Sequence, residues 1–427
     1  MTAPAGQLPR LLRGVGKRPM HELDEHLAVH GPLAQDHLAP EQIVSSVQTA
    51  GLRGHGGAAF PTAIKLRSVA NRRGAKVLLI NATEGEPASK KDRALLREVP
   101  HLVLDGAAVA ARAVGAKQAI LAVSEADTRG RHALSAALSE RRERGLSRSE
   151  PDWELVSTPE RYLIGQETAL VNLINGGPGL PTFGARPFQR GVRGRPTLVQ
   201  NAETLAHIAL IARHGPRWFR GLGSAAHPGS TLISVAGAVS APGVYEIAHG
   251  MELSELLRSV GSDAPAAVLI GGYFGTWLSA SAIPAVRLSG EGLAEHGAAL
   301  GAGVIVALPR AACPVAETAR VAEWFSDQSA GQCGPCVNGL GAIAHTVGQV
   351  SVGAANRADL ANLERWSTEL RGRGACQHPD GASRFLGSAL ATFTAEFADH
   401  ARHGRCERCA FPAVLPVPLT MPLAQAA

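Results

Sequence analysis

Residues 51–66 read Gly-Leu-Arg-Gly-His-Gly-Gly-Ala-Ala-Phe-Pro-Thr-Ala-Ile-Lys-Leu, and this stretch guides the interpretation of the whole chain. Its glycines, Gly54 and Gly56 among them, allow tight turns and a close approach to a ligand, because no Cβ intervenes. Phe60 can cover a planar ring, and Lys65 offers a positive charge to a phosphate. A helix beginning at Pro61 would add an anion site at its N-terminus. The stretch therefore predicts a loop that binds a flat, phosphorylated ligand.

Two common nucleotide motifs do not fit this loop. Its glycines match neither G-x-G-x-x-G nor G-x-x-x-x-G-K-[ST]. An ordinary glycine-rich surface loop is the alternative, so the neighbouring sequence has to decide between the two interpretations. Lys76–Asn81 is a continuous apolar run that ends in an amide, as expected of a buried parallel strand.

Polar residues follow this expected strand. They are Asn81, Glu84 and Glu86, and the charged run Lys91-Asp92-Arg93 comes after them. Ligands of parallel sheets bind at the carboxyl ends of the strands, so these side chains are candidates for a binding site. A charged helix N-terminus is the alternative interpretation of the two acids.

Two later segments carry similar chemistry. Tyr162-Leu-Ile-Gly165-Gln166-Glu167 joins an aromatic ring, a glycine and polar groups at an expected helix start, for which a plain helix cap is the alternative. The adjacent amides of Gln200 and Asn201 can donate and accept hydrogen bonds at the edge of a heteroaromatic ring.

Helical and strand patterns alternate through this half of the chain, which predicts an α/β domain with a mostly parallel sheet over residues 46–228, after a lead-in over 1–45. The expected helices are 40–48, 91–114 and 128–141, and the expected strands are 76–81, 118–123 and 153–157.

The second half has a different pattern. Short strands at 231–235, 268–270 and 303–307 with a helix at 253–260 predict a small β-grasp domain over 229–310. From Val315 onward the pattern is helical, at 315–325, 338–350, 359–370 and 383–397, which predicts a four-helix bundle over 311–400. A tail, 401–427, carries Cys406-Glu-Arg-Cys409.

Composition narrows the class of protein. A chain of 427 residues with 45% hydrophobic content can bury a large core. The apolar stretch Ala264–Val286 is interrupted by glycines and prolines, which favours strands and turns over a membrane span. The start lacks an apolar core, so no secretory signal is expected. The net charge of +6 is dispersed and aromatic residues make up only 4%, which argues against a nucleic-acid partner.

The six cysteines are too sparse for a disulfide scaffold and point to a reducing, cytoplasmic compartment. Cys333-Gly-Pro-Cys336 resembles a thioredoxin-type dithiol, but such a motif should follow a strand, and a helical pattern precedes it here. A zinc site from the two C-x2-C pairs and an iron-sulfur cluster are the other interpretations. A cluster triplet would need a cysteine at Ala330, which leaves Cys333, Cys336 and Cys376 as ligands. Cys313 is expected to be a buried core thiol.

Taken in order, these motifs resemble the family of flavin-carrying, NADH-oxidising 51-kDa subunits of respiratory complex I, shared with NAD-linked hydrogenases. The resemblance covers about residues 20–400. It implies an FMN-binding α/β domain, a soluble-ligand-binding β-grasp domain and a helical bundle with a [4Fe-4S] or [3Fe-4S] cluster on Cys333, Cys336 and Cys376. The residues that match FMN- or NADH-binding positions, in part with changed side chains, are Gly54, Gly56, Phe60, Lys65, Asn81, Glu84, Glu86, Tyr162, Gly165, Gln166, Glu167, Gln200 and Asn201.

Several positions depart from the family pattern. His55 replaces an Arg, Thr83 an Asp, Lys90 an aromatic residue, Gln166 a Glu, Gln200 an Asn and Ala330 a cluster Cys. Two carboxylates are lost and one cation is gained near the expected nucleotide, which lowers the repulsion that a 2′-phosphate would meet. We therefore expect a nucleotide preference that is relaxed or switched toward NADPH. A fourth cluster ligand is expected from Cys406, Cys409 or His378, if there is one.

The sequence thus predicts a cytoplasmic NADH dehydrogenase subunit, peripheral to the inner face of the membrane. Hydride would pass from NAD(P)H to FMN, and electrons onward through the cluster to an iron-sulfur protein or to other oxidoreductase subunits. Two alternatives stay open at this point. One is a non-redox scaffold or ligand-binding protein, and the other is a flavin-only diaphorase that lacks the cluster.

Overall fold

The computed structural model describes residues 7–16, 18–33, 39–146, 150–262 and 264–418. These residues divide into two compact units. The first lies within Met1–Gly85, Lys90–Ile233 and Val244–Gly250, and the second within Glu86–Ser89, Ser234–Gly243 and Met251–Ala427. The boundary predicted at residue 310 falls inside the second unit, and the division into three domains stays a prediction.

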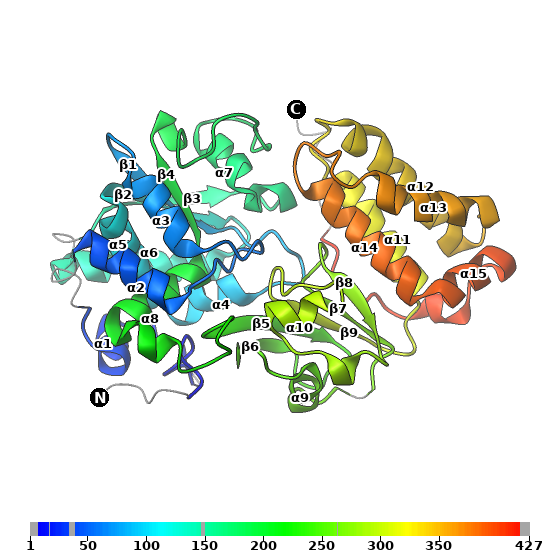
Figure 1. Cartoon of the computed structure of the whole chain (residues 1–427), viewed down its shortest axis with the longest axis horizontal. Coiled ribbons are helices and arrows are strands. Elements are labelled where there is room, and N and C mark those ends of the chain that lie inside the picture. The colour runs from blue at the N-terminus through cyan, green and yellow to red at the C-terminus, as the bar shows by residue number, and fades with distance from the viewer. Residues whose placement is uncertain (1–6, 17, 34–38, 147–149, 263, 419–427) are drawn as a thin grey trace. The chain divides into compact units, whose positions relative to one another are not determined.

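A four-stranded parallel sheet forms the centre of the first unit (Figure 1). Its strands are β1 (Lys76–Ala82), β2 (Ala116–Ser124), β3 (Asp152–Thr158) and β4 (Thr197–Asn201), in the order β3-β2-β1-β4. All three pairings are parallel. Residues 77–80 of β1 are fully buried, because strands covered by helices on both faces need apolar side chains on both faces.

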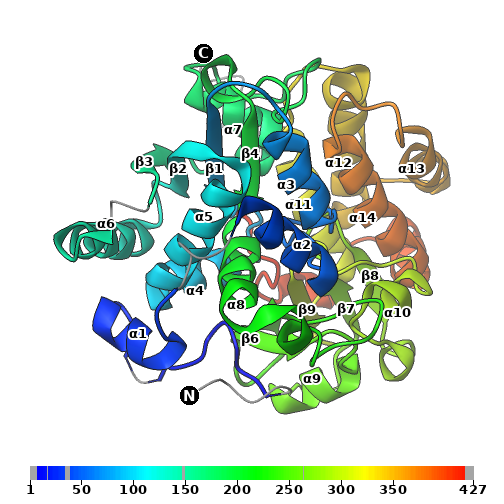
Figure 2. The same cartoon turned by 60° about the vertical axis from the view of Figure 1, so that its left-hand side comes forward.

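Helices surround this sheet, namely α1 (Leu23–His30), α2 (Pro40–Ala50), α3 (Thr62–Ala70), α4 (Lys91–Glu98), α5 (Pro100–Val114), α6 (Thr128–Glu143), α7 (Glu167–Ile174) and α8 (Ala202–Phe219). The helix predicted over 91–114 is two helices, because Val99 is non-helical and precedes Pro100. Figure 2 shows α5 beside α8. Gly106 permits this contact, since a Cβ there would lie 1.8 Å from the carbonyl oxygen of Leu205.

The second sheet is mixed and has the order β6-β5-β9-β7-β8. Its strands are β5 (Ser230–Gly237), β6 (Gly243–Ala248), β7 (Ala267–Ile270), β8 (Thr276–Ser279) and β9 (Val304–Leu308), and α9 (Leu253–Ser259) and α10 (Gly290–Ala294) lie between them in sequence. β5 runs parallel to β9, whereas β7 runs antiparallel to β8 and β9. The stretch 264–286 forms β7, β8 and turns, as the sequence predicted, and also the 3₁₀ helix Ile283–Ala285.

The chain after β9 is helical: α11 (Pro314–Asp327), a π-helical turn (Pro335–Leu340), α12 (Gly341–Val352), α13 (Arg357–Glu369), α14 (His378–Thr392) and α15 (Thr394–His403). The helix predicted over 383–397 is two helices that meet at Phe393. Phe325 and Phe385 pack edge-to-face in the core, with ring centroids 5.9 Å apart. The α/β layer, the second sheet and the helical region confirm the predicted fold class.

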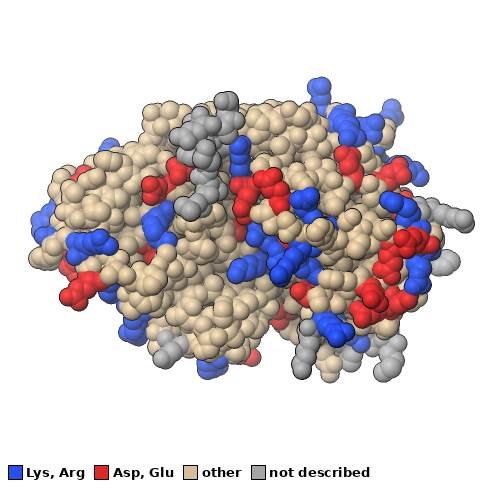
Figure 3. All heavy atoms as spheres, turned by 180° about the vertical axis from the view of Figure 1, so that it is seen from behind, with Lys and Arg blue, Asp and Glu red and all other residues tan. Residues whose placement is uncertain are grey.

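Two properties of the described residues bear on partners. Among the parts of the chain that the structure places, no helix has the length and apolar character needed to cross a membrane. Figure 3 shows Lys and Arg side chains interspersed with Asp and Glu over the face drawn.

Candidate functional site

The carboxyl ends of β1 and β4 bring two predicted ligands together. Asn81 and Asn201 are direct partners in the register of these strands. The chain runs from β1 to β2 on one side, whereas β4 lies on the other side, so the strand order reverses between β1 and β4. Open parallel sheets bind ligands at such a reversal. The site predicted from the sequence therefore has the position that the topology favours.

The segment that begins with Tyr162 is attached to this strand end. Asn81 donates from Nδ2 to the carbonyl oxygen of Gly165 over 2.8 Å. Tyr162 opens the short 3₁₀ turn Tyr162–Gly165. A Cβ on Gly85 would lie 2.9 Å from the carbonyl oxygen of Tyr162, so only glycine allows the two backbones to approach this closely.

The glycine loop closes on itself and approaches β4. Gly54 N–H donates to the carbonyl oxygen of Phe60 over 2.9 Å. A Cβ on Gly56 would stand 3.5 Å from the Cβ of Asn201, which places the loop beside the end of β4. The Phe60 side chain is 47% exposed and free to meet a planar ring.

Two residues of the predicted ligand segments adopt a left-handed backbone. They are Ala59, with φ of 48°, and Glu84, with φ of 45°. Non-glycine residues rarely adopt this conformation, and such strain gathers at functional sites. Both positions therefore support a binding role for the segments around them.

Lys65 and Glu167 meet although they are far apart in sequence. Lys65 Nζ contacts the Glu167 carboxylate and also donates to the carbonyl oxygen of Val199 over 3.1 Å. Both side chains are partly exposed. The Lys65 ammonium is therefore held near the end of β4 by protein partners. A ligand phosphate could take the place of the Glu167 carboxylate beside it.

The two acids after β1 have different positions. The Glu84 carboxylate accepts from the backbone N–H groups of Asp92 and Arg93, over 2.9 and 3.0 Å. Glu86 belongs to the second unit, where it accepts from Tyr273 N–H over 2.9 Å. Glu84 thus lies in the first unit with the other predicted ligands, and the nucleotide-binding role of Glu86 stays a prediction.

The two glutamines differ in a way that bears on a ligand. Gln166 Oε1 caps α7 by accepting from Ala169 N–H over 2.8 Å, in line with the cap interpretation. Gln200 is only 3% exposed, and its Nε2 has no hydrogen-bond partner among the described residues. A buried donor without an acceptor is costly, so this amide is suited to a ligand acceptor beside it.

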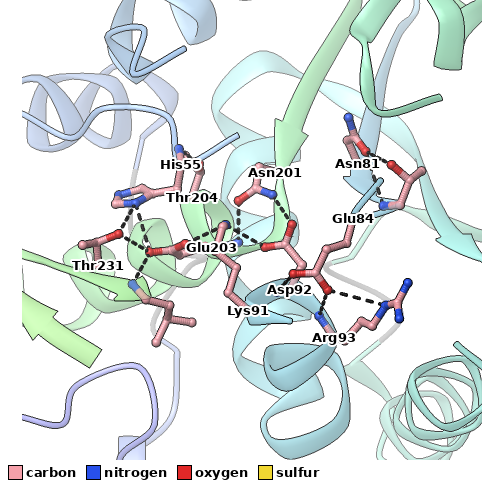
Figure 4. Close-up of polar contacts among 12 residues, drawn as sticks. His55, Asn81, Glu84, Lys91, Asp92, Arg93, Asn201, Glu203, Thr204 and Thr231 are labelled. Atoms are coloured by element: carbon pink, nitrogen blue, oxygen red, sulfur yellow. Dashed lines mark hydrogen bonds and ion pairs between the residues drawn. The ribbon is translucent and has the colours of Figure 1, made fainter. Parts of the chain in front are cut away.

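A buried charged network that the sequence did not predict lies behind this site (Figure 4). Glu203 on α8 is fully buried and accepts from Lys91 Nζ over 2.7 Å and from Leu232 N–H over 2.8 Å. His55 Nδ1 lies 3.0 Å from the same carboxylate. Lys91 also reaches Asp92 over 3.0 Å. The network joins the glycine loop to the N-termini of α4 and α8.

Charge balance stabilises this network. Burial alone would raise the pKa of the Glu203 carboxyl, but His55 and Lys91 hold it well below its usual range. Burial likewise opposes a charge on Lys91, yet Asp92 and Glu203 raise its pKa. For Asp92 the effect of burial dominates and raises the pKa. Glu203 and Lys91 therefore form a charged pair in the interior.

Three cysteines gather at the start of the π-helical turn. Cys333 and Cys336 are within hydrogen-bond range of each other, and Cys376 lies close enough to interact with both thiols. Ser329 bonds to Cys336 beside the position of Ala330. His378, one candidate for a fourth ligand, uses its Nε2 to bond the carbonyl oxygen of Phe325 over 2.8 Å.

The other three cysteines form a second group. Cys313 is buried, as predicted, but it is not a simple core thiol, because its sulfur faces His400, Cys406 and Cys409. One donor atom from each of these four residues lies within 4.8 Å of all the others. Cys406 and Cys409 are thus grouped with Cys313.

Comparisons with known proteins identify the family. Residues 47–210 match the Nuo51 FMN-binding domain, and residues 316–400 match the iron-sulfur binding region of NADH-ubiquinone oxidoreductase-F. The F 2 subunit of the NADH-quinone oxidoreductase of Rhizobium meliloti (strain 1021) is 32% identical over 420 residues, which is 93% of this chain and 99% of that protein. The chain belongs to the family of 51-kDa, FMN-carrying complex I subunits.

Other relatives in this family belong to hydrogenases. The NADP-reducing hydrogenase subunit HndC of Solidesulfovibrio fructosivorans is 30% identical over 417 residues, 94% of this chain and 85% of that one. The crystal structure of an NAD⁺-reducing [NiFe]-hydrogenase in the H2-reduced state matches with a TM-score of 0.83 and 30% identity. That match covers 94% of this chain and 68% of the hydrogenase chain.

The family and the function expected from the sequence are thereby confirmed. The protein is an NADH dehydrogenase-type flavoprotein subunit with FMN and an iron-sulfur cluster as cofactors. Which residues bind each cofactor is a separate question, and the individual assignments stay predictions.

Proposed function

We propose that the first unit holds FMN at the ends of β1 and β4, where NADH or NADPH reduces it. Electrons then pass through a cluster on Cys333, Cys336 and Cys376 to an iron-sulfur partner. The observation that carries the proposal is the strand end where Asn81 and Asn201 pair, beside the glycine loop and the unpartnered amide of Gln200.

The described residues fit FMN. Gln200 Nε2 supplies a donor for a ring acceptor, Gly54 and Gly56 allow the loop to approach the ring, and Lys65 supplies a cation for the phosphate. FMN accepts hydride from the nicotinamide and releases electrons singly. Phe60, Tyr162 and Glu167 receive the nucleotide in this proposal.

Cys333, Cys336 and Cys376 fit a cluster that has three thiolate ligands. The two thiols of Cys333-Gly-Pro-Cys336 lie close together, and Cys376 approaches from the start of α14. Ala330 offers no ligand atom, so a [3Fe-4S] cluster or a [4Fe-4S] cluster with one non-cysteine ligand follows.

We also propose that NADPH is accepted beside NADH. Gln166 is neutral and occupied as the cap of α7, and Thr83 is a buried hydroxyl that donates to Asn81 Oδ1 over 2.9 Å. Neither adds a negative charge against a 2′-phosphate. A kcat/KM that favours NADH by several orders of magnitude would contradict this part of the proposal.

The partner in this proposal is an iron-sulfur subunit of a larger oxidoreductase that works in the cytoplasm or at the inner face of the membrane. Two observations support it. Relatives named as subunits of NADH-quinone oxidoreductase and of an NADP-reducing hydrogenase align over most of this chain. All six cysteines are unpaired, as expected in a reducing compartment.

The test is the FMN, iron and acid-labile sulfide content of anaerobically purified protein, with low-temperature EPR before and after dithionite. Stoichiometric FMN with about three to four irons is expected. FMN without iron would identify a diaphorase. The absence of both FMN and iron would favour a non-redox scaffold protein. Loss of iron in Cys333→Ser and in Cys376→Ser would show that these two cysteines, rather than other cysteines, bind the cluster.

A further inference from the structure

Four metal-binding side chains of the second unit converge outside the proposed cluster site. Cys313 is the N-cap residue of α11, His400 lies on α15, and Cys406 and Cys409 follow α15. The Sγ atoms of Cys406 and Cys409 are 3.7 Å apart. His400 Nε2 lies 3.4 Å from Cys313 Sγ and 3.9 Å from Cys409 Sγ. Cys406 Sγ is within hydrogen-bond range of the other three residues.

These separations match the ligand shell of one tetrahedral ion. Zinc binds thiolate at about 2.3 Å and imidazole nitrogen at about 2.0–2.1 Å, which sets sulfur–sulfur distances of about 3.8 Å and sulfur–nitrogen distances of about 3.5 Å. A cubane cluster binds each thiolate through a different iron atom, so its ligand sulfurs lie farther apart. The group is therefore the size of a mononuclear site.

The surroundings orient the donors toward a single point. His400 is 2% exposed, and its Nδ1 lies 3.3 Å from the carbonyl oxygen of Val350, so an Nδ1–H donates there and Nε2 keeps a lone pair for the thiols. Imidazoles that bind metals are typically held in this way. Cys313 Sγ accepts from Ala316 N–H over 3.5 Å at the start of α11, which fixes the sulfur where it faces the other three donors.

We propose that Cys313, His400, Cys406 and Cys409 bind a structural zinc ion. Three thiolates and one imidazole are a closed donor set with no position left for a substrate, which is the arrangement of structural zinc. The ion joins the N-terminus of α11, α15 and the chain that follows α15, and it is distinct from the iron-sulfur cluster.

The segment after Cys409 shows what the ion would stabilise. The backbone N–H groups of Val414 and Leu415 donate to the Glu317 carboxylate on α11, over 3.0 and 2.9 Å. Leu415 is fully buried, although the segment has no regular secondary structure. A short chain held by few contacts gains most from a metal cross-link near its start.

The experiment measures zinc and iron in the purified full-length chain with its FMN bound. We expect about one zinc per chain, and an X-ray absorption spectrum at the zinc edge with three sulfur ligands and one nitrogen ligand. The variant Cys406→Ser/Cys409→Ser should lose zinc but keep iron and FMN. The matched variant Cys333→Ser/Cys376→Ser should lose iron but keep zinc.

Three outcomes would overturn the proposal: wild-type protein without zinc, a zinc shell other than three sulfurs and one nitrogen, or loss of iron rather than zinc in Cys406→Ser/Cys409→Ser. The last would place the iron-sulfur cluster at this group. If Cys406→Ser/Cys409→Ser fails to fold, His400→Cys still tests the site. This variant should retain zinc, with four sulfur ligands in place of three sulfurs and one nitrogen. FMN and iron report separately on the proposed function.

Discussion

The buried Glu203 carboxylate pairs with Lys91 and contacts His55, so its charge should matter more for stability than that of any surface acid. Replacing it in Glu203→Gln leaves the ammonium of Lys91, itself 4% exposed, without its closest carboxylate. Removing one partner of a buried ion pair costs about 3–5 kcal/mol in the free energy of unfolding. Urea denaturation of the variant against wild type measures this loss.

Glu154→Gln is the matched control for Glu203→Gln. Glu154 pairs with Arg193 over 3.3 Å, and the side chains are 36% and 50% exposed. Exposed pairs contribute about 0–1 kcal/mol because water screens them. Equal losses for the two variants would show that the interior pair is not specially stabilising.

Nucleotide preference should depend on the charge at Gln166. Gln166→Glu keeps an oxygen for the cap of α7 but restores a carboxylate beside the proposed nucleotide site. We expect the kcat/KM ratio of NADH to NADPH to rise about tenfold, which corresponds to about 1.4 kcal/mol of repulsion with the 2′-phosphate. Steady-state kinetics with both nucleotides measure the ratio.

The control for Gln166 is Gln189→Glu. Gln189 also accepts a backbone hydrogen bond, from Arg186 N–H over 3.1 Å, but lies outside the predicted nucleotide residues. Its ratio should stay at the wild-type value. A rise in both variants would indicate a general effect of net charge.

Single residues show where sequence reasoning stops. Lys91 and Asp92 look like a solvated helix start, and only the fold shows that both are buried and that Lys91 pairs with Glu203. Glu86 stands two positions after Glu84, yet its carboxylate binds Tyr273 N–H in the second unit. Spacing indicates which residues are near in sequence, whereas tertiary packing decides which of them meet.

At the scale of elements, the packing of α5 on α8 depends on Gly106. In Gly106→Ala the new methyl group would lie 1.8 Å from the carbonyl oxygen of Leu205, a distance that forces the helices apart. Overpacking of this kind costs about 1–3 kcal/mol. Thermal unfolding should show a lower midpoint for the variant.

Gly348→Ala is the control, and its thermal unfolding midpoint should rise rather than fall. Gly348 lies within α12, and nothing is within 4 Å of a Cβ built there. Alanine in an open helical position stabilises by about 0.5–1 kcal/mol relative to glycine. A lower midpoint in both variants would mean that helix backbone effects, not the α5–α8 contact, explain Gly106→Ala.

The docking of α1 should make stability depend on pH. Burial lowers the pKa of His30 to about 3, and the charges of His26 and Arg213 lower it further. Arg13 acts in the same direction, whereas the Asp105 carboxylate raises this pKa. An unfolded histidine has a pKa of about 6.5, so the unfolded state binds the proton first. The stabilisation is therefore complete above about pH 6.5 and is lost as the pH falls toward 3, by at most about 1.4 kcal/mol per unit.

His30→Gln should flatten this dependence without removing it, because the pKa of His26 and of His101 is also lowered by burial. Denaturation curves between about pH 7 and 5 give the slope for wild type and variant. His132→Gln, at an exposed position of α6, should leave the slope unchanged. An unaltered slope in His30→Gln would contradict the claim that the lowered pKa of His30 makes stability depend on pH.

Elements were easier to predict than their ends. The apolar run of β1 and the expected helix 128–141 identified real elements, because their patterns are long and periodic. β4 was not predicted, since its five residues continue without a break into α8. Pro100 divides one expected helix, and a change of backbone at Phe393 divides another.

At the scale of the whole molecule, the order of motifs predicted the family and the fold class, but not how the cysteines are shared. The sequence predicts Cys406 and Cys409 only as candidates for a fourth cluster ligand, or for a zinc site shared with Cys333 and Cys336. Their partner Cys313 lies almost a hundred residues earlier, at the start of α11. Only the folded helical region brings them together, which no local spacing reveals.

The final prediction concerns the position of Ala330. In the proposed cluster, Cys333, Cys336 and Cys376 would leave one iron of a cubane without a thiolate. Ala330 is partly exposed beside Ser329. Ala330→Cys supplies the missing ligand, so iron should rise from about three to about four per chain. EPR should change from a signal in the oxidised protein, typical of [3Fe-4S], to one that appears on reduction.

Ser329→Cys, one residue earlier, is the control and should not raise iron. Unchanged iron in Ala330→Cys would mean that the cluster already has a fourth ligand, and the zinc content would show whether that ligand comes from the Cys313 group.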